Sequence, residues 1–255
     1  MDILDSITRA AERIDARGWT EGTGGNLSVI VDEWNADASD KGFFPLAYNA
    51  DALEGRMIII TRSGCRICDI PRCPERELAL LRVEKGGVRL LWGLRDGGKP
   101  SSELAAHLLS HAARMNTDPA HRAVAHMHAT HMIAAGMTFP EDERAFTRML
   151  WSMCTEALMF LPDGVGMLPW MPCGTDEIGR LTAEKLAGFP VILWQNHGVF
   201  ASGATLEDAL GRAEIADKAA ELYLMTRGAE PRTISDEQLR ELASVLGIKP
   251  RDGWL

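Results

Sequence analysis

Residues 121–129 read HRAVAHMHA, a stretch that predicts a β-strand with two histidines two positions apart. Successive side chains of a strand point to opposite faces, so His126 and His128 are expected to share one face. A third histidine, His197, lies in a distant stretch and precedes Gly198, which permits a close approach of the backbone. Three neutral imidazoles that leave one position open commonly hold a catalytic divalent metal, most often zinc. The sequence therefore predicts a reaction centre at these three residues.

Strands and helices alternate on both sides of this stretch. Helices are expected over residues 2–17, 100–115, 130–137, 141–151, 175–187 and 205–226, with a last one starting at the capping box of Ser235. A glycine turn at 23–25 leads into one strand, and further strands are expected over 57–61, 88–92, 157–161, 191–194 and 199–201. Residues 32–56 are expected to form an irregular insertion, and 62–64 and 162–166 to form turns. Because no linker or repeat interrupts this order, we expect one layered α/β domain over residues 1–255.

Composition and charge limit the classes of function. The 255 residues carry a formal net charge of −9, which argues against a nucleic-acid partner because such a partner requires a basic surface. A small phosphorylated ligand needs only a few N–H groups and hydroxyls at turns. No apolar run reaches the roughly 18 residues that cross a bilayer, and the first residues lack the features of a signal peptide. We therefore expect a cytoplasmic protein with no membrane partner.

The five cysteines are expected to be reduced thiols. Cys65, Cys68 and Cys73 cluster in a spacing that could indicate a metal or redox site. No fourth partner lies nearby, and Cys154 and Cys173 stand alone. Disulfides are rare in the cytosol, so free thiols are the simpler interpretation.

Other histidines and one carboxylate accompany the predicted centre. His131 completes a pattern close to that of metallo-β-lactamase-like hydrolases, but Thr130 stands where that pattern requires Asp, so we expect a structural role for His131. Glu103 is expected in the first turn of a helix, where it could complement the helix dipole or act as a general acid/base or displaceable metal ligand. His107 and His111 follow at steps of four residues, and we expect packing and surface roles for them.

Three turns offer groups suited to phosphate binding. The turns are Gly24-Gly25-Asn26, Ser63-Gly64 and Ser101-Ser102. Together they supply backbone N–H groups, a side-chain amide and hydroxyls.

In their order along the chain, these residues resemble the class II aldolase/adducin family. The resemblance rests on residues 24–28, 61–64, 101–107, 126–130 and 197–199, and it extends over nearly the whole sequence. Within the family, residues 91–94, 146–151, 162–171 and 174–179 are similar to the members that cleave L-rhamnulose 1-phosphate.

The resemblance implies a fold, a cofactor and a set of site residues. The fold would be α/β, with three α/β/α layers around a central mixed, largely antiparallel sheet, and the assembly a homotetramer with sites at subunit interfaces. One Zn²⁺ per subunit would lie on His126, His128 and His197. Glu103 would be the catalytic acid/base, and Glu156 would assist from a neighbouring subunit. The phosphate of a small phosphorylated ketose would be surrounded by Gly25, Asn26, Ser63, Gly64, Ser101 and Ser102.

The implied reaction is reversible, zinc-dependent retro-aldol cleavage of L-rhamnulose 1-phosphate to dihydroxyacetone phosphate and L-lactaldehyde, with the metal as Lewis acid. The chain departs from the family at Thr23, where Asn is frequent, at Cys65, where Lys is common, and at Gln195-Asn196, where Pro and an aromatic residue are expected. These departures affect the expected contacts to phosphate and the expected identity of the sugar, and they leave the predicted metal ligands unchanged.

Several alternatives stay open at this point. Within the family, the chain could be a fuculose-phosphate aldolase, a ribulose-phosphate 4-epimerase or a dehydratase. A zinc hydrolase would require an Asp beside the histidine pair. A non-catalytic, adducin-like scaffold could lose the histidines, whereas this chain keeps all three and Glu103.

Overall fold

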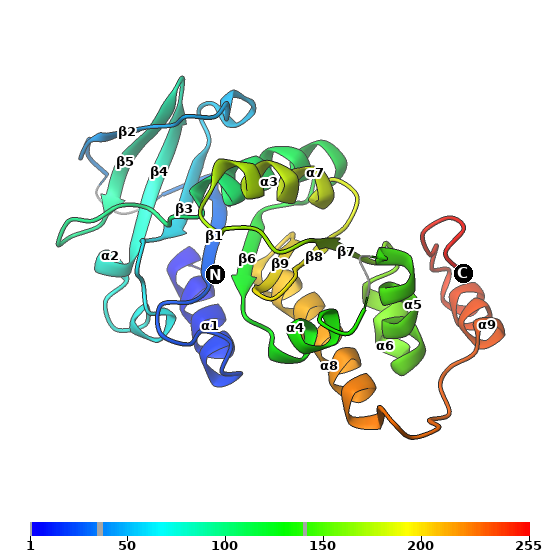
Figure 1. Ribbon diagram of the computed structural model, residues 1–255. Helices are drawn as coiled ribbons and strands as arrows, with labels where there is room; N and C mark the ends of the chain where they lie inside the picture. The colour runs from blue at the N-terminus through cyan, green and yellow to red at the C-terminus, as the bar shows by residue number, and fades with distance from the viewer. Residues whose placement is uncertain (1, 35–37, 140–141) are drawn as a thin grey trace.

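A single twisted sheet organises the protein (Figure 1). The computed structural model describes residues 2–34, 38–139 and 142–255. Within them, nine strands form the sheet in the order β2-β5-β4-β3-β1-β6-β9-β8-β7. The strands are β1 (Asn26–Val31), β2 (Phe43–Pro45), β3 (Met57–Thr61), β4 (Leu78–Glu84), β5 (Gly87–Gly93), β6 (Ala123–Met127), β7 (Val165–Leu168), β8 (Val191–Trp194) and β9 (Gly198–Gly203). Among these nine strands, only β7 and β8 pair in parallel, so the mixed, largely antiparallel sheet is confirmed.

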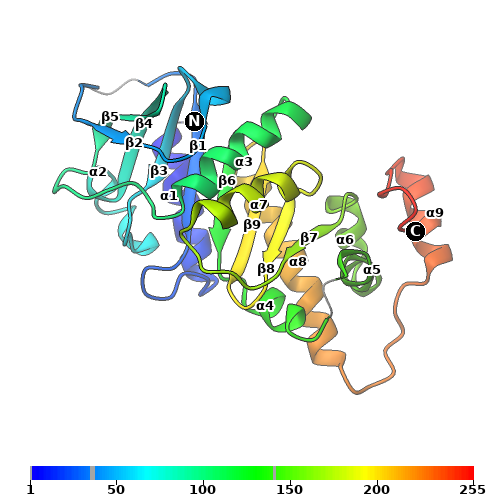
Figure 2. The same ribbon diagram turned by 45° about the horizontal axis from the view of Figure 1, so that its top comes forward.

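Helices cover both faces of the sheet, which confirms the three-layer α/β/α fold (Figures 1 and 2). One face carries α3 (Leu104–Thr117) and α7 (Asp176–Leu186). The opposite face carries α1 (Ile3–Ala16), α4 (Thr130–Gly136) and α8 (Leu206–Thr226). The remaining helical segments are α2 (Pro74–Glu77), α5 (Glu143–Met153), α6 (Thr155–Phe160), α9 (Asp236–Leu246), η1 (Asp51–Leu53) and η2 (Ile67–Asp69).

Alternation along the central strand β1 separates an apolar core from a polar seam. Leu27 and Val29 join the large apolar cluster on the side of α1 and α8. Asn26 and Ser28 point the other way and bond to side chains at the start of α3 and along it. The register of β1 with β6 places Asn26 opposite His126, so these two side chains share the face that α3 covers.

Several expectations about local structure differ from the structure. Residues 157–161 are not a strand, because Ala157 and Leu158 are buried together while Met159 and Phe160 are partly exposed, as on one helical turn. A short apolar run fits either element, and sequence periodicity does not separate the two. The strand at this point is β7, which begins where a turn was expected to end.

The segment 32–56 is also more regular than expected, because β2 and η1 fall inside it. Strand β4 was not anticipated at all; it pairs with β3 and β5.

The helix expected over 100–115 begins later, at Leu104. Pro100 forms an isolated bridge with Arg62, and the peptide N–H of Ser101 donates to Thr61 O at 2.9 Å. These contacts hold residues 100–103 extended or in a turn, so Glu103 occupies the N-cap position rather than the first helical turn. The helix expected over 141–151 begins at Glu143; residue 141 lies outside the described residues.

Across the described ranges, no helix combines the length and the apolar character that a membrane span requires.

Candidate metal centre

Three histidines converge at the end of β6 and at the turn between β8 and β9. His126 lies on β6, and His128 follows directly after that strand, where its peptide N–H donates to Trp19 O at 2.9 Å. His197 lies in the turn that joins β8 to β9. One ring nitrogen from each of the three lies within 4.8 Å of the other two. The structure thus brings together the three residues that the sequence proposed as ligands.

Hydrogen bonds on the outer side of two rings fix which nitrogen faces the centre. The Nδ1–H of His126 donates to Val199 O at 3.1 Å, and that of His128 donates to the Glu21 carboxylate at 2.7 Å. The Nε2 atoms of His126 and His128 are buried and have no hydrogen-bond partner among the described residues. Each therefore presents a lone pair to the same space, as metal-binding imidazoles do when an outer partner sets the tautomer.

The electrostatic surroundings keep two of these rings neutral. Burial and the neighbouring His197 and His128 hold the pKa of His126 well below its ordinary value. Burial also lowers the pKa of His197, although Glu103 opposes this shift. A neutral imidazole is the form that binds a metal ion.

Two glycines leave room for the rings. A Cβ at Gly198 would lie 2.8 Å from His126 Cε1 and 3.0 Å from His128 Cδ2, and one at Gly24 would lie 2.7 Å from His128 Cε1. The His126 ring cannot retreat, because it stacks on Phe200 with ring centroids 4.8 Å apart. Glycine at both positions is therefore a requirement of the site.

Glu103 stands beside the histidines. Its side chain is buried, and Oε2 lies 3.7 Å from His126 Nε2. The same oxygen accepts a hydrogen bond from Asn26 Nδ2 at 2.9 Å. Its Oε1 accepts no hydrogen bond from any residue that the structure describes. One carboxylate oxygen is thus held in place while the other can accept a proton.

These features fit a catalytic divalent metal. The donors are three imidazole nitrogens, two of them buried with unused lone pairs, and a carboxylate lies next to them. Zinc sites with three protein ligands and an open position have this composition.

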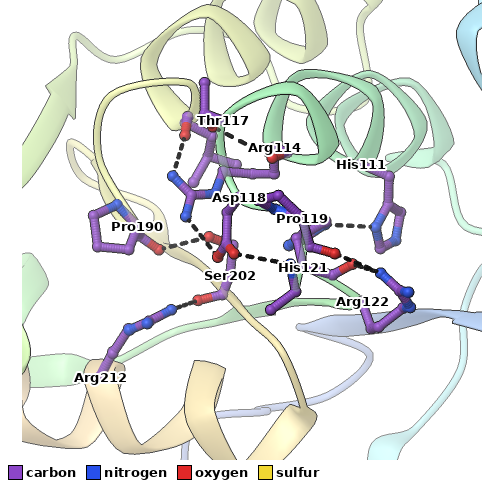
Figure 3. Close-up of polar contacts among 12 residues, drawn as sticks. His111, Arg114, Thr117, Asp118, Pro119, His121, Arg122, Pro190, Ser202 and Arg212 are labelled. Atoms are coloured by element: carbon purple, nitrogen blue, oxygen red, sulfur yellow. Dashed lines mark hydrogen bonds and ion pairs between the residues drawn. The ribbon is translucent and has the colours of Figure 1, made fainter.

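A buried polar network extends from Glu103 into the protein; we define it as Asn26, Ser28, His107, His111 and His121. His107 Nε2 bonds to Asn26 Oδ1, and Ser28 Oγ lies 2.6 Å from His107 Nδ1 and 2.8 Å from His111 Nε2. His111 Nδ1 lies 2.8 Å from His121 Nε2, and Figure 3 shows this pair among the polar contacts at the far end of the network. The expected surface role of His107 and His111 is wrong, because both are fully buried.

The direction of these hydrogen bonds follows from the carboxylate at one end. An ionised Glu103 only accepts, so the Asn26 amide donates to it and its Oδ1 accepts from His107 Nε2–H. Ser28 then donates to His107 Nδ1 and accepts from His111, and every bond of the network donates toward Glu103. The other end is His121 Nδ1, a buried lone pair without a partner in the described structure.

Burial keeps all three imidazoles of the network neutral, as this pattern of donors requires. It lowers the pKa of His107 to about 3 and that of His121, with a further contribution from Arg114, to about 4. The pKa of His111 is also lowered well below its ordinary value by burial, and His121 adds to the shift.

Two of the turns proposed for phosphate lie side by side. The peptide N–H of Ser63 donates to Lys99 O at 2.8 Å, and that of Ser101 donates to Thr61 O. Ser101 Oγ accepts from the peptide N–H of Glu103 at 3.2 Å, so this turn continues into the residue that carries the buried carboxylate. Ser63 and Ser102 are exposed.

The remaining proposed phosphate residues adjoin this region. Gly64 has a φ of +70° in the turn after β3. Gly25 has a φ of +79°, and an added Cβ there would lie 3.1 Å from His126 O. Asn26 begins β1 and reaches Glu103. The six residues proposed for phosphate thus gather at the end of the sheet that carries Glu103 and the histidines.

Glu156 lies elsewhere in the subunit. It is exposed on α6, and among the described residues it makes no hydrogen bond or ion pair with Glu103 or the three histidines. A role from a neighbouring subunit stays a prediction. His131 turns away from the centre and bonds through Nδ1 to Asp217 of α8 at 2.8 Å, which agrees with the structural role expected for it.

All five cysteines are free, as the sequence predicts. Burial raises the pKa of the Cys65 thiol, which favours its protonated form. Cys65, Cys68 and Cys73 do not come together as a metal site in the described part of the chain, whereas Cys173 lies beside Glu103 and His197.

Sequence reasoning missed Glu21, Ser28, His121 and Cys173. Two signals for the network were present: Ser28 stands two positions after Asn26 on a strand, and His107 lies four after Glu103 on a helix. Each pair predicts a shared face, but only the packing of α3 on β1 shows that the two faces meet. No signal in the sequence pointed to Cys173.

Comparison with known proteins finds relatives over nearly the whole chain. The chain is 38% identical to the rhamnulose-1-phosphate aldolase of Listeria innocua over 263 residues, which cover 100% of this chain and 96% of that protein. It is 39% identical to the rhamnulose-1-phosphate aldolase of Mannheimia succiniciproducens, with 99% and 97% covered. The solved structure of a sugar-phosphate aldolase from Thermotoga maritima superposes with a TM-score of 0.78 at 29% identity and covers 90% of this chain and 97% of its own. A sequence profile of the class II aldolase and adducin N-terminal domain matches residues 5–224, and the chain therefore belongs to the class II aldolase and adducin family.

Proposed function

We propose that this protein is a zinc-dependent aldolase that reversibly cleaves L-rhamnulose 1-phosphate to dihydroxyacetone phosphate and L-lactaldehyde. One observation carries the proposal: two buried imidazole nitrogens without partners converge with a third histidine, next to a buried carboxylate. Full-length relatives named rhamnulose-1-phosphate aldolase support the choice of substrate.

His126, His128 and His197 would hold the metal. When bound, a divalent cation supplies Lewis-acid stabilisation of the negative charge that develops as the carbon–carbon bond breaks. Zinc is the proposed ion because it favours imidazole nitrogens and tolerates a change in coordination number.

Glu103 would move the proton that the reaction requires. Its Oε2 is held by the Asn26 amide, so Oε1 is the atom that would accept a proton and return it at the carbon next to the carbonyl group. Glu103 is only 7% exposed, which limits exchange of that proton with solvent.

The turns around Glu103 would fix the other end of the substrate. The hydroxyls of Ser63, Ser101 and Ser102 and the backbone N–H groups of Gly25 and Gly64 are suited to a phosphate group. A phosphate anchored there would determine which carbon of the ketose lies beside Glu103. In a homotetramer, which we propose for the active protein, Glu156 of a neighbouring subunit would complete the site.

A product assay tests the proposal. The protein is incubated with L-rhamnulose 1-phosphate or L-fuculose 1-phosphate, and dihydroxyacetone phosphate is measured. We expect faster cleavage of L-rhamnulose 1-phosphate. No cleavage of either ester would refute the proposed aldolase activity, and faster cleavage of L-fuculose 1-phosphate would refute the proposed substrate.

Two variants test the assigned roles. His126→Ala should lose both bound zinc and activity, and Glu103→Gln should keep zinc and lose most turnover. His131→Ala is the matched control, because His131 bonds to Asp217 away from the centre and should keep its zinc. Full turnover by Glu103→Gln would remove Glu103 from the mechanism.

A further inference from the structure

A cysteine lies at the metal centre. The sulfur of Cys173, a carboxylate oxygen of Glu103 and a ring nitrogen of His197 all lie within 4.8 Å of one another. His197 also belongs to the histidine group, so the sulfur adjoins that group at His197.

The residues that follow this cysteine fix its place in the fold. The next residue, Gly174, has a φ of +71°. A Cβ there would lie 3.5 Å from the backbone oxygen of Ser102, which is the residue before Glu103. Thr175 then caps α7 by accepting from the peptide N–H of Ile178. Cys173 therefore joins a helix start to the turn that carries Glu103.

An independent observation points to a ligand at this place. The side chain of His126 is only 1% exposed, and its Nε2 has no hydrogen-bond partner among the described residues. This atom lies 3.7 Å from the same Glu103 carboxylate that neighbours the sulfur. A pocket of about 380 Å³ reaches the centre at His197, and it is lined by Trp170, Met171, Pro172, Cys173, Asn196 and His197.

We propose that the Cys173 thiolate is a further ligand of the metal bound by the three histidines, and that the substrate displaces it on binding. The proposal rests on the function proposed above, because it requires a metal at the histidines. Three histidines and a thiolate complete a four-ligand zinc site. On binding, the sulfur–metal bond forms and the thiol proton leaves to solvent, so metal uptake releases a proton.

The thiolate would also narrow the choice of metal. Soft sulfur ligands favour Zn²⁺, whereas Mg²⁺ and Mn²⁺ prefer oxygen. A site with this sulfur should therefore discriminate more strongly against Mn²⁺ than a site of three histidines and a carboxylate.

Cobalt substitution of the full-length protein tests the ligand directly. A thiolate bound to Co²⁺ gives an intense sulfur-to-metal charge-transfer band in the near ultraviolet, which nitrogen and oxygen ligands do not give. We expect this band in the unmodified protein and in Cys154→Ser, and its loss in Cys173→Ser. The zinc affinity of Cys173→Ser should fall by about tenfold or more.

Alkylation gives a second readout. Iodoacetamide forms a carbon–sulfur bond with a free thiol while iodide and a proton leave, and mass spectrometry measures the rate at each cysteine. Zn²⁺ should slow modification of Cys173 and leave that of Cys73 unchanged; Cys73 is the control because it is exposed and belongs to no group of potential metal ligands among the described residues.

The outcomes separate this proposal from the proposed function. Co²⁺ that binds without the charge-transfer band, or that keeps the band in Cys173→Ser, would overturn the role of Cys173 and leave the histidine site intact. Failure of the protein to bind Co²⁺ or Zn²⁺ at all would overturn both.

Discussion

Gly198→Ala should damage the metal centre without touching any proposed ligand. The added methyl carbon would lie 2.8 Å from His126 Cε1, 2.8 Å from Met127 O and 3.0 Å from His128 Cδ2. Met127 O belongs to a strand paired with β9, so the backbone cannot yield easily. The two rings would therefore have to move.

The size of the effect follows from that geometry. The closest approach is about 0.6 Å shorter than ordinary contact, which exceeds the roughly 0.5 Å tolerance of a working site. Displaced ligands should lower zinc affinity about 10- to 100-fold. Overpacking against Phe200 should also lower the free energy of unfolding of the zinc-free protein by about 1–3 kcal/mol.

Competition with a chromophoric chelator measures the zinc affinity, and chemical denaturation of the zinc-free protein measures stability. Gly211→Ala is the matched control. Gly211 lies within α8, and an added Cβ there would meet no atom within 4 Å. It should keep full zinc affinity and gain about 0.5–1 kcal/mol of stability. Unchanged zinc affinity in Gly198→Ala would refute the close packing of rings and glycine on which the site rests.

Three further predictions concern the groups behind the ligands. Ser28→Ala leaves two buried imidazole nitrogens without partners, so the free energy of unfolding should fall by about 1–3 kcal/mol for each nitrogen, as measured by chemical denaturation. A total loss below about 0.5 kcal/mol would contradict the buried polar network. His107 and His121 have folded pKa values of about 3 and about 4, below the unfolded value of about 6.5, so the unfolded chain binds more protons in acid. Their stabilisation is complete above pH 6.5 and is lost as the pH falls: the free energy of unfolding should drop by on the order of 2 kcal/mol per histidine between pH 7 and 5, and a constant value would contradict neutral burial. Glu21→Gln keeps an acceptor for His128 but removes the charge, so zinc affinity should fall about tenfold, and no change would show that the carboxylate does not tune this ligand.

How far the sequence predicts this structure depends on the range of the interactions involved. The alternation of side chains along a strand is a local feature, and it correctly predicted that the rings of His126 and His128 lie on one face. The apolar run at 157–161 carries no such pattern, and there a helix was mistaken for a strand. The start of α3 was misplaced because the bridge of Pro100 to Arg62 joins distant segments.

The surroundings of the ligands depend on tertiary contacts that no spacing reveals. The link from Ser28 to His107 and His111 requires β1 to pack against α3. The approach of Cys173 to His197 requires the loop before α7 to lie over the β8–β9 turn. The proposed role of Glu156 depends on a second subunit, which no spacing along one chain reveals.

Titration of zinc into the chelator-stripped protein, with dihydroxyacetone phosphate release from L-rhamnulose 1-phosphate as the readout, tests the central claim most directly. Cleavage should be absent at the start and should rise to a plateau at one equivalent of zinc per chain. Cleavage that persists at its full rate after all divalent ions are removed would contradict the account.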